Sequence, residues 1–370
     1  MPRLPRALRR LAAAACATLL AGCETLAYYT QAVGGQLSIT SSAQPIDKVL
    51  EDPATPADLR ARLRLAQEIR EFASRELGLP DDGSYRRYAD LGRPFVVWNV
   101  FAAPEFSTRA LESCFPVAGC VSYRGYFAQA DANARAQRLR AQGYDVQVSG
   151  IPAYSTLGWF DDPLLSTFIR YPEAELARLV FHELAHRVAY VRDDTAFNES
   201  FAVAVERAGV RRWLASRDRT GELSAFLAAR QRQREFIALV EATRARLDQV
   251  YASGLPAEQM RAAKRAGFDE LLRDYAALKA RWGGFPGYDR IIGTSPGNAL
   301  LASINAYSKL VPAFERLLEA EGGNLPRFYA AVKEIAGLAA AERCRRLTEA
   351  LAAGAAAGSP AAGAPSSAAC

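Results

Sequence analysis

Residues 173–191, EAELARLVFHELAHRVAYV, carry the pattern from which the fold of this 370-residue chain can be predicted. Apolar residues recur at helical spacing and no Gly or Pro interrupts them, so the stretch predicts one helix. His182 and His186, the only histidines in the sequence, fall one turn apart on the same face of that helix. Two imidazoles at this spacing can bind one Zn²⁺, and Glu183 beside them can act as a general base. The motif H-E-x-x-H therefore predicts one zinc ion per chain.

The alternative is a chance pair of helix histidines beside a surface glutamate. An unpaired imidazole would be costly to bury in so apolar a helix, and the chain uses no other histidine. Both points favour the zinc interpretation.

A catalytic zinc needs a third protein ligand, which here must be Asp, Glu or Cys because both histidines are used. Asp193 and Asp194 fall near the end of the same predicted helix, too far along its axis to turn back. Glu199 follows a turn and opens a second predicted helix, so we expect it to be the ligand. The alternative is a glutamate favoured at a helix N-terminus by the macrodipole. We expect Asn198 and Glu206 to support the ligands without contacting the metal, Glu206 by accepting a hydrogen bond from a histidine N–H.

Residues 1–22 are expected to be a signal peptide. Four arginines precede an apolar segment that is too short to span a bilayer. Leu-Ala-Gly-Cys at positions 20–23 resembles the bacterial lipobox, which makes Cys23 the expected lipidation site; the alternative is an ordinary secretory signal. Removing residues 1–22 takes away four basic and no acidic residues, so the net charge falls from +6 to +2. Nucleic acid is therefore not an expected partner.

Cys114 and Cys120 flank the loop-like sequence FPVAG. In an oxidising periplasm they are expected to form a small disulfide loop, the alternative being two buried free thiols. Cys344 and Cys370 are left over, and the sequence leaves open whether they pair.

Strand-like and helical segments are distributed unevenly along the chain. The strand-like segments, rich in β-branched and aromatic residues, are 94–101, 121–127 and 144–149. All three lie in the N-terminal half, where we expect a small mixed sheet, and the C-terminal half reads as helical. The predicted fold class is therefore α+β and predominantly helical.

We expect one folded domain at residues 23–351. Its parts are a sheet-containing region to about residue 170, the two site helices at about 171–217, and a helical region at about 218–351. The Ala-, Gly-, Ser- and Pro-rich residues 352–370 are expected to be a disordered tail.

The segment before the histidine helix, residues 151–167, is rich in turn-forming and aromatic residues. In zincin folds the segment that leads to the active-site helix often holds the substrate backbone. Tyr154, Ser155, Trp159 and Asp161 are therefore candidate substrate-cleft residues. The alternative is a packed connecting loop.

Several segments together resemble the bacterial predicted aminopeptidase lipoproteins, with the H-E-x-x-H motif of gluzincin-like zinc metallopeptidases. The matching segments are the lipobox and residues 29–37, 154–160, 182–186, 198–202, 296–300 and 307–314. The sequence NESFA at 198–202 resembles the gluzincin element whose glutamate binds the metal, although the separation of Glu199 from His186 is shorter than in the best-known gluzincins. The resemblance implies a zincin-like fold and a zinc-dependent peptidase. It also makes Tyr307 the first candidate for stabilising an oxyanion; the alternative is a core tyrosine.

The predicted function is therefore a zinc peptidase, an expected aminopeptidase, that acts on peptide substrates. We expect it to be lipid-anchored in the bacterial cell envelope, facing the periplasm, at the outer membrane because residue 24 is Glu rather than Asp. Two alternatives remain, namely a zinc endopeptidase and a non-catalytic chaperone or assembly lipoprotein with a structural metal. The sequence does not determine the natural substrate or the oligomeric state.

Overall fold

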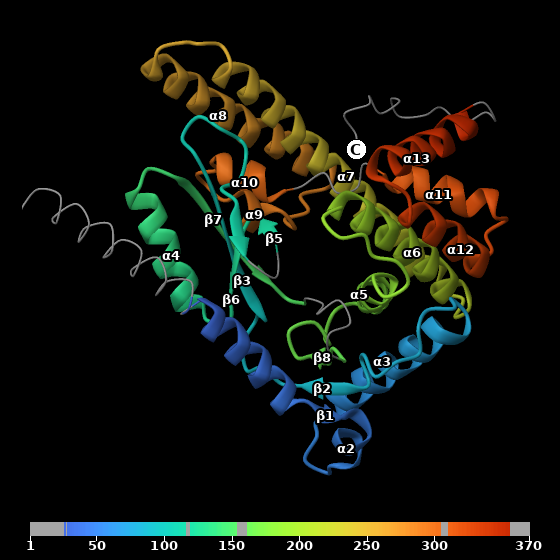
Figure 1. The fold of residues 1–370 in the computed structure, drawn as a ribbon. Coiled ribbons are helices and arrows are strands. Elements are labelled where there is room, and N and C mark those ends of the chain that lie inside the picture. Colours follow the sequence, from blue (N-terminus) through green and yellow to red (C-terminus); the bar gives the residue numbers. More distant parts are fainter. Residues whose placement is uncertain (1–25, 27, 116–118, 154–160, 305–309, 356–370) are drawn as a thin grey trace, which may run out of the picture.

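The computed structural model describes residues 26, 28–115, 119–153, 161–304 and 310–355 (Figure 1). It confirms an α+β fold that is predominantly helical. The strands are β1 (Gln44–Pro45), β2 (Arg87–Ala89), β3 (Val97–Ala103), β4 (Ser113–Phe115), β5 (Gly119–Val121), β6 (Arg124–Tyr126), β7 (Asp145–Ile151) and β8 (Leu164–Leu165). After an N-terminal helix over residues 28–42, the helices are α2 (Ile46–Glu51), α3 (Ala57–Arg75), α4 (Gln129–Ala141), α5 (Glu173–Ala185), α6 (Thr195–Ala215), α7 (Thr220–Tyr251), α8 (Ala257–Arg281), α9 (Asp289–Ile292), α10 (Asn298–Ser303), α11 (Val311–Ala320), α12 (Leu325–Ala336) and α13 (Ala340–Ala355).

The predicted strands form an antiparallel sheet in the order β6–β3–β7. Side chains alternate across β3, so each face of the sheet carries its own contacts. Trp98 and Val100 pack in one cluster with buried residues of α4, whereas Phe101 and Ala103 pack with Ala299 of α10. The sheet is thus covered by helices on both faces.

A second, mixed sheet has the order β1–β2–β8, in which β2 pairs antiparallel with β1 and parallel with β8. The sequence did not predict these strands, which are only two or three residues long. Beside them, α3, α5, α6, α11 and α12 share the main hydrophobic core, in which Phe181 and Phe201 are fully buried. The core therefore fixes α5 and α6 relative to the short sheet.

Helix α5 is shorter than the sequence predicts. The apolar pattern predicts a helix to residue 191, but α5 ends at Ala185. The N–H of Val188 donates to the carbonyl of Ala185, the three-residue spacing of a tightened last turn. Beyond it, the side-chain amide of Asn198 bonds to both the N–H and the carbonyl of Val191, at 2.7 and 2.8 Å. These contacts turn the chain directly into α6.

Two predictions about the chain's periphery can be compared with the structure. Cys114 and Cys120 form the predicted disulfide across the β4–β5 hairpin, and Cys344 is disulfide-bonded as well. The predicted tail begins too early, because α13 continues to Ala355 and its last residues have the alanine-rich composition of a good helix former.

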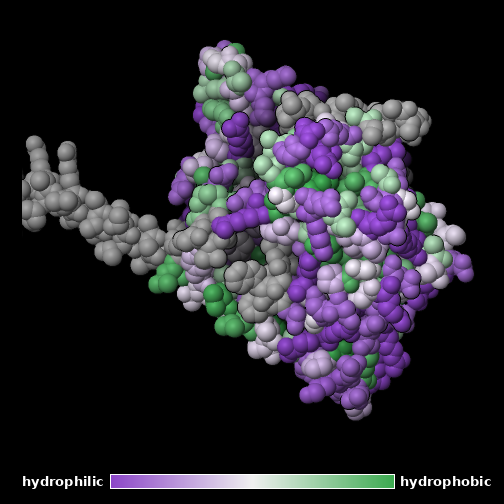
Figure 2. All heavy atoms as spheres, turned by 45° about the vertical axis from the view of Figure 1, so that its right-hand side comes forward, coloured by the Kyte–Doolittle hydropathy of each residue, from purple (hydrophilic) through white to green (hydrophobic). Residues whose placement is uncertain are grey.

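The most exposed large apolar residues of the described chain lie near its N-terminal end. They are Leu26, Leu37 and Val33. All three lie on the N-terminal helix or at its start. Figure 2 shows hydrophobic residues in several places on one face of the molecule, including its lower left. Among the described residues, no helix has the length and apolar character needed to cross a membrane.

Candidate metal centre

Helices α5 and α6 bring the predicted metal ligands together. His182 lies in the last turn of α5, His186 caps its C-terminal end, and Glu199 lies in the first part of α6. The Nε2 atoms of the two histidines are 3.2 Å apart, and the Glu199 carboxylate lies 3.3 Å from His182 Nε2 and 3.6 Å from His186 Nε2. The packing of α6 against α5 therefore brings together three donor atoms from residues that are up to 17 positions apart in the sequence.

This donor set fits a zinc ion. Two imidazole nitrogens and one carboxylate are the ligand set of many catalytic zinc sites, and the three ligand atoms lie within 4.8 Å of one another. His182 is held with one ring nitrogen toward Glu206 and the other toward Glu199 and His186. The ring is therefore oriented before any ion binds.

Glu206 supports His182 from the buried side. Its carboxylate lies 2.9 Å from His182 Nδ1 and accepts a hydrogen bond of 3.2 Å from Arg178. Arg178 in turn donates to Glu175 at 2.7 Å, and Arg230 donates to Glu175 at 2.8 Å. The network joins α5, α6 and α7. An Nδ1–H donated to Glu206 leaves Nε2 of His182 with a free lone pair for a metal.

The charges in this network set the protonation of the metal-free centre. Burial alone would raise the pKa of Glu206, but the Arg178 charge and the His182 hydrogen bond lower it to about 2. Burial alone would lower the pKa of His182, but hydrogen bonds to Glu199 and Glu206 raise it to about 10. Burial and the neighbouring His182 charge lower the pKa of His186 to about 4. In the metal-free centre His182 therefore carries a proton on each ring nitrogen, and His186 is neutral.

The pKa of Glu183 is shifted in the opposite direction to the pKa of Glu206. Burial, together with the negative charges of Glu199 and Asp162, raises its pKa to about 7, although the His182 charge opposes the shift. A carboxylate with a pKa near neutrality is suited to accept and return a proton. Glu183 can thus act as a base, whereas Glu206 remains a permanent anion.

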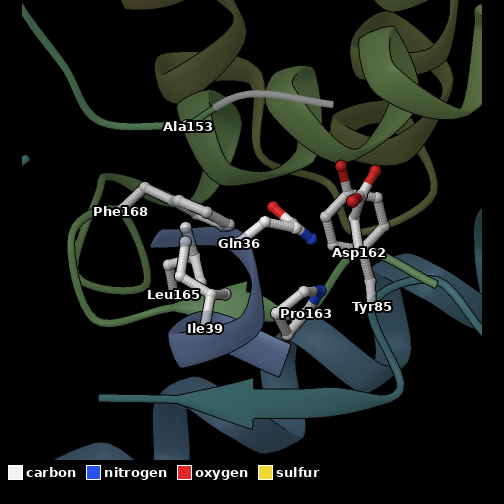
Figure 3. A pocket seen from close by; sticks show the side chains of 8 residues that line it. All are labelled: Gln36, Ile39, Tyr85, Ala153, Asp162, Pro163, Leu165 and Phe168. Atoms are coloured by element: carbon white, nitrogen blue, oxygen red, sulfur yellow. The ribbon is translucent and has the colours of Figure 1, made fainter. Parts of the chain in front are cut away.

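Burial raises the pKa of Tyr85, and the charges of Glu183 and Asp162 raise it further; neither Tyr85 nor Asp162 was predicted from the sequence as a site residue. Tyr85 is 3% exposed and has a positive φ of 63°, a conformation that is rare for a bulky residue. Its N–H donates to the Asp162 carbonyl at 2.7 Å, and the two side chains point the same way in Figure 3. The predicted cleft residue Asp161 is exposed, whereas its neighbour Asp162 is buried. The adjacent acids alone do not reveal which one faces inward.

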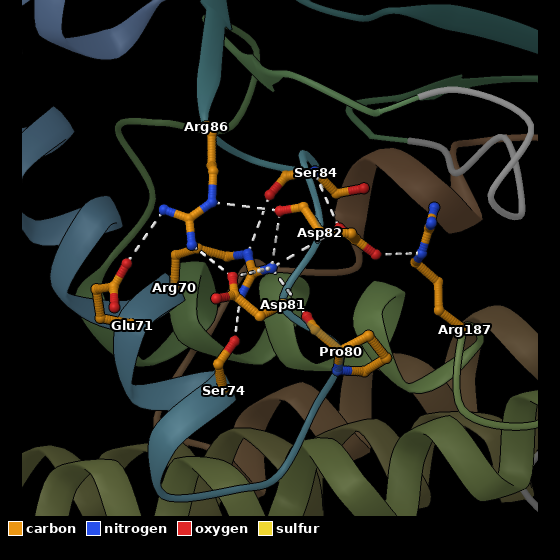
Figure 4. Close-up of polar contacts among 9 residues, drawn as sticks. All are labelled: Arg70, Glu71, Ser74, Pro80, Asp81, Asp82, Ser84, Arg86 and Arg187. Atoms are coloured by element: carbon orange, nitrogen blue, oxygen red, sulfur yellow. Dashed lines mark hydrogen bonds and ion pairs between the residues drawn. The ribbon is translucent and has the colours of Figure 1, made fainter.

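A buried arginine holds the loop that carries Tyr85 (Figure 4). Arg70 is 1% exposed and donates to the carbonyls of Pro80, Ser84 and Asp82 at 2.9, 3.0 and 3.2 Å. The Asp82 carboxylate pairs with Arg187 at 2.5 Å, one residue after His186. This loop is therefore attached to the C-terminal end of α5, and the strained backbone is fixed by the contacts around it.

The remaining predicted residues are placed as follows. Asn198 bonds to Val191 rather than to a histidine. Asp194 is not a ligand but the N-cap of α6, where it accepts from the Phe197 N–H at 3.0 Å, so α6 begins before Asn198. The other predicted residues, Tyr154, Ser155, Trp159, Tyr307 and Cys23, lie outside the described residues.

Two further tyrosines lie near Glu199. Burial raises the pKa of both Tyr123 and Tyr190, and the charge of Glu199 raises them further. The rings of Tyr190 and His186 are 6.4 Å apart. Both side chains are partly exposed, Tyr123 at 39% and Tyr190 at 49%, and no sequence motif identified them.

Comparison with known proteins gives a family. The model of the family described as "Putative aminopeptidase" matches residues 27–347, which is most of the chain. Neither the curated proteins nor the solved structures gave a match. The matched range contains both helices of the metal centre, the Tyr85 loop and Asp162. The chain therefore belongs to the Putative aminopeptidase family.

Proposed function

We propose that the protein is a zinc-dependent peptidase with a zincin-like fold, in which His182, His186 and Glu199 hold the metal. The observation that supports this proposal best is the convergence of the three donor atoms next to Glu183. A metal site with a purely structural role has no need of a glutamate directly after its first histidine, whereas hydrolysis by a metal-activated water needs a general base there.

Each residue has a distinct part in the proposed reaction. Zinc, when bound, would supply Lewis-acid activation of water and of the scissile carbonyl. Glu183 would take the proton of the attacking water and return it to the leaving amine. Glu206 would keep the His182 ring in place, and Tyr307 would donate a hydrogen bond to the developing oxyanion. Tyr123 and Tyr190 are alternative donors from the described chain.

Hydrolysis of a mixed peptide library would test this function. The lipid-free form of the mature chain, residues 24–370 without Cys23, should be made and assayed with and without a chelator. We expect cleavage that is lost with the chelator and restored by zinc, and the cleaved bonds will distinguish an aminopeptidase from an endopeptidase. Absence of cleavage by zinc-loaded protein would favour the non-catalytic alternative.

We also propose that Cys23 is lipidated and that the domain faces the periplasm at the outer membrane. The lipobox supports this proposal. Cys23→Ser should abolish labelling by a lipid precursor and release the protein from the membrane fraction. Unchanged labelling of Cys23→Ser would rule the lipid site out.

A further inference from the structure

The N-terminal helix over residues 28–42 has one side packed on the protein and one side exposed. Leu26, Val33 and Leu37 are 69%, 58% and 60% exposed, the three highest values among the large apolar residues of the described chain. At about 100° of rotation per residue, positions 26, 33 and 37 fall within about 40° of one another around the helix axis. These three side chains therefore form one apolar ridge along the helix.

The opposite side of the helix fixes it to the protein. The Gln31 side chain donates to the Gly125 carbonyl at 3.2 Å and accepts from the Phe127 N–H at 3.1 Å. A Cβ at Gly35 would lie 2.1 Å from the Phe127 ring, so glycine permits the close contact there. Further along, Ile39 is 2% exposed and belongs to the main hydrophobic core. The helix is therefore held with its ridge outward.

The polar side chains beside the ridge are bonded to the helix itself. Thr30 donates to the Leu26 carbonyl at 2.9 Å, and Ser41 donates to the Ser38 carbonyl at 3.1 Å. Residues 25–46 also contain no charged side chain. A charge or an unpaired donor would be costly to remove from water, whereas a hydroxyl bonded to the backbone loses less. This side of the helix can therefore be dehydrated at low cost.

The place of the ridge in the sequence indicates what covers it. Leu26 follows Cys23, the proposed lipid site, by three residues. Three residues span at most about 11 Å even when fully extended. An acyl chain on Cys23 would therefore keep the start of the ridge at the membrane surface.

We propose that the ridge of Leu26, Val33 and Leu37 lies on the lipid bilayer. A helix with an apolar side and no opposing charge is suited to lie in the plane of the interface, with only that side in contact with the acyl chains. The inference rests on the proposed lipid anchor for the identity of the occupant, and it adds a contact that the anchor does not provide. A single flexible attachment leaves a domain free to rotate, whereas an attachment and a ridge together fix its orientation.

An oriented helix would also orient the metal centre. Ile39 and Ala43 share the main hydrophobic core with Tyr85 and Phe181, and Phe181 directly precedes His182 on α5. Closely packed interiors have low compressibility, so the position of one helix fixes the position of its neighbours. The metal centre would therefore stand at one distance and one orientation from the membrane.

Vesicle binding by the lipid-free mature chain tests the ridge without the anchor. The chain should bind vesicles of phosphatidylethanolamine and phosphatidylglycerol at high lipid concentration, because three side chains alone give a weak contact. Loss of the ridge should weaken binding at least about 10-fold, which is the value of fully burying one such side chain. The ridge variant is Leu26→Ser with Val33→Ser and Leu37→Ser.

A matched control replaces three aliphatic side chains that are 39%, 39% and 40% exposed elsewhere on the molecule. It is Leu227→Ser with Leu255→Ser and Ile291→Ser. This control should bind vesicles like the parent. Equal weakening by the two triple variants, or no binding of the parent, would overturn the proposal.

Salt and a tryptophan probe separate this apolar contact from attraction between basic side chains and the anionic lipid. Binding through the ridge should persist at about 0.5 M NaCl, where the Debye length is about 4 Å. Val33→Trp should bind more tightly, and its fluorescence should shift to shorter wavelength when vesicles are added. It also serves as the test if the ridge variant folds poorly. Loss of parent binding at high salt, or an unshifted spectrum of Val33→Trp, would contradict the proposal.

Further outcomes distinguish the ridge from the lipid anchor and from self-association. If Cys23→Ser keeps its lipid label while the lipid-free chain binds vesicles through the ridge, the anchor proposal fails and the membrane face stands. If Cys23→Ser loses its label and the lipid-free chain does not bind vesicles, the anchor stands and the membrane face fails. Self-association that the ridge variant abolishes, without vesicle binding by the parent, would assign the ridge to a second copy and overturn the proposal. Light scattering after size-exclusion chromatography measures it.

Discussion

The two sides of the metal centre contain the same kind of residue in opposite environments. On the α7 side, Glu206 accepts a hydrogen bond from Arg178 and its pKa is lowered to about 2. On the Tyr85 side, partial burial and the negative charges of Glu199 and Asp162 raise the pKa of Glu183 to about 7. Glu206 thus has a cationic hydrogen-bond partner that holds it ionised, whereas the neighbouring negative charges make ionisation of Glu183 less favourable.

The two carboxylates are therefore suited to different tasks, Glu206 to orienting a metal ligand and Glu183 to transferring a proton. A carboxylate paired with a guanidinium stays ionised and can orient an imidazole at any ordinary pH. A carboxylate near other carboxylates changes its protonation easily, as a general base requires. The comparison predicts that substitutions on the two sides affect metal affinity and turnover differently.

The largest effect is expected from the histidines themselves. Purified mature chain should contain close to one zinc per chain, and His182→Ala or His186→Ala should lose most of it because two protein ligands cannot hold the ion tightly. Metal analysis after dialysis measures this directly. Full retention of zinc in both variants would contradict the assignment.

Glu183→Gln should remove turnover without removing metal. Loss of a general base costs at least about 10²- to 10⁴-fold in rate, and the isosteric amide should leave zinc content and folding unchanged. The measurements are kcat on a peptide substrate and zinc per chain. A variant that turns over like wild type would show that Glu183 is not the base.

Glu199→Gln should weaken zinc binding by about 10²-fold or more. Even the loss of a residue that only hydrogen-bonds to a metal ligand lowers metal affinity by about 10- to 100-fold. Competition with a zinc chelator gives the affinity. The control is Asp194→Asn, which should keep its zinc because Asp194 caps α6 and pairs with Arg343. If Asp194→Asn loses zinc and Glu199→Gln does not, the ligand lies in the turn.

Arg178→Met should have a smaller effect of the same kind as Glu206→Gln. Both should weaken zinc binding by about 10- to 100-fold. Glu206→Gln removes the anion that orients His182, and Arg178→Met removes the cation that holds Glu206 in place. The double variant should be no worse than Glu206→Gln alone, which isolates the coupling. Additive losses would mean that Arg178 acts independently of His182.

The last prediction concerns the pH dependence of zinc binding, which should change by only about tenfold for each pH unit. The raised pKa of metal-free His182, about 10, means that zinc must displace a proton at neutral pH. The zinc affinity should therefore rise by about tenfold per pH unit between pH 6 and 8. Calorimetry in two buffers of different ionisation enthalpy should detect about one released proton. A flat affinity across this range would contradict the protonation assigned to His182.

Local sequence rules determined the helix that carries His182 and His186 and the spacing of these two residues on it. These features depend on residues within one or two turns of each other, where periodicity and Gly or Pro are decisive. The convergence of Glu199 with the two histidines could be predicted because only a short turn separates it from the first helix. The disulfide between Cys114 and Cys120 could be predicted for the same reason.

The tertiary structure alone decided the partners that give each carboxylate its role. Arg178 and Glu206 are 28 positions apart, and Tyr85 meets Asp162 from a loop 77 positions earlier in the chain. No local pattern distinguishes buried Asp162 from exposed Asp161, because the choice depends on how that segment packs against the Tyr85 loop. The end of α5 at Ala185 was also set from outside the helix, by the hydrogen bonds of Asn198 to the linker. Burial and pairing with distant charges determine protonation, and both arise only when the helices pack.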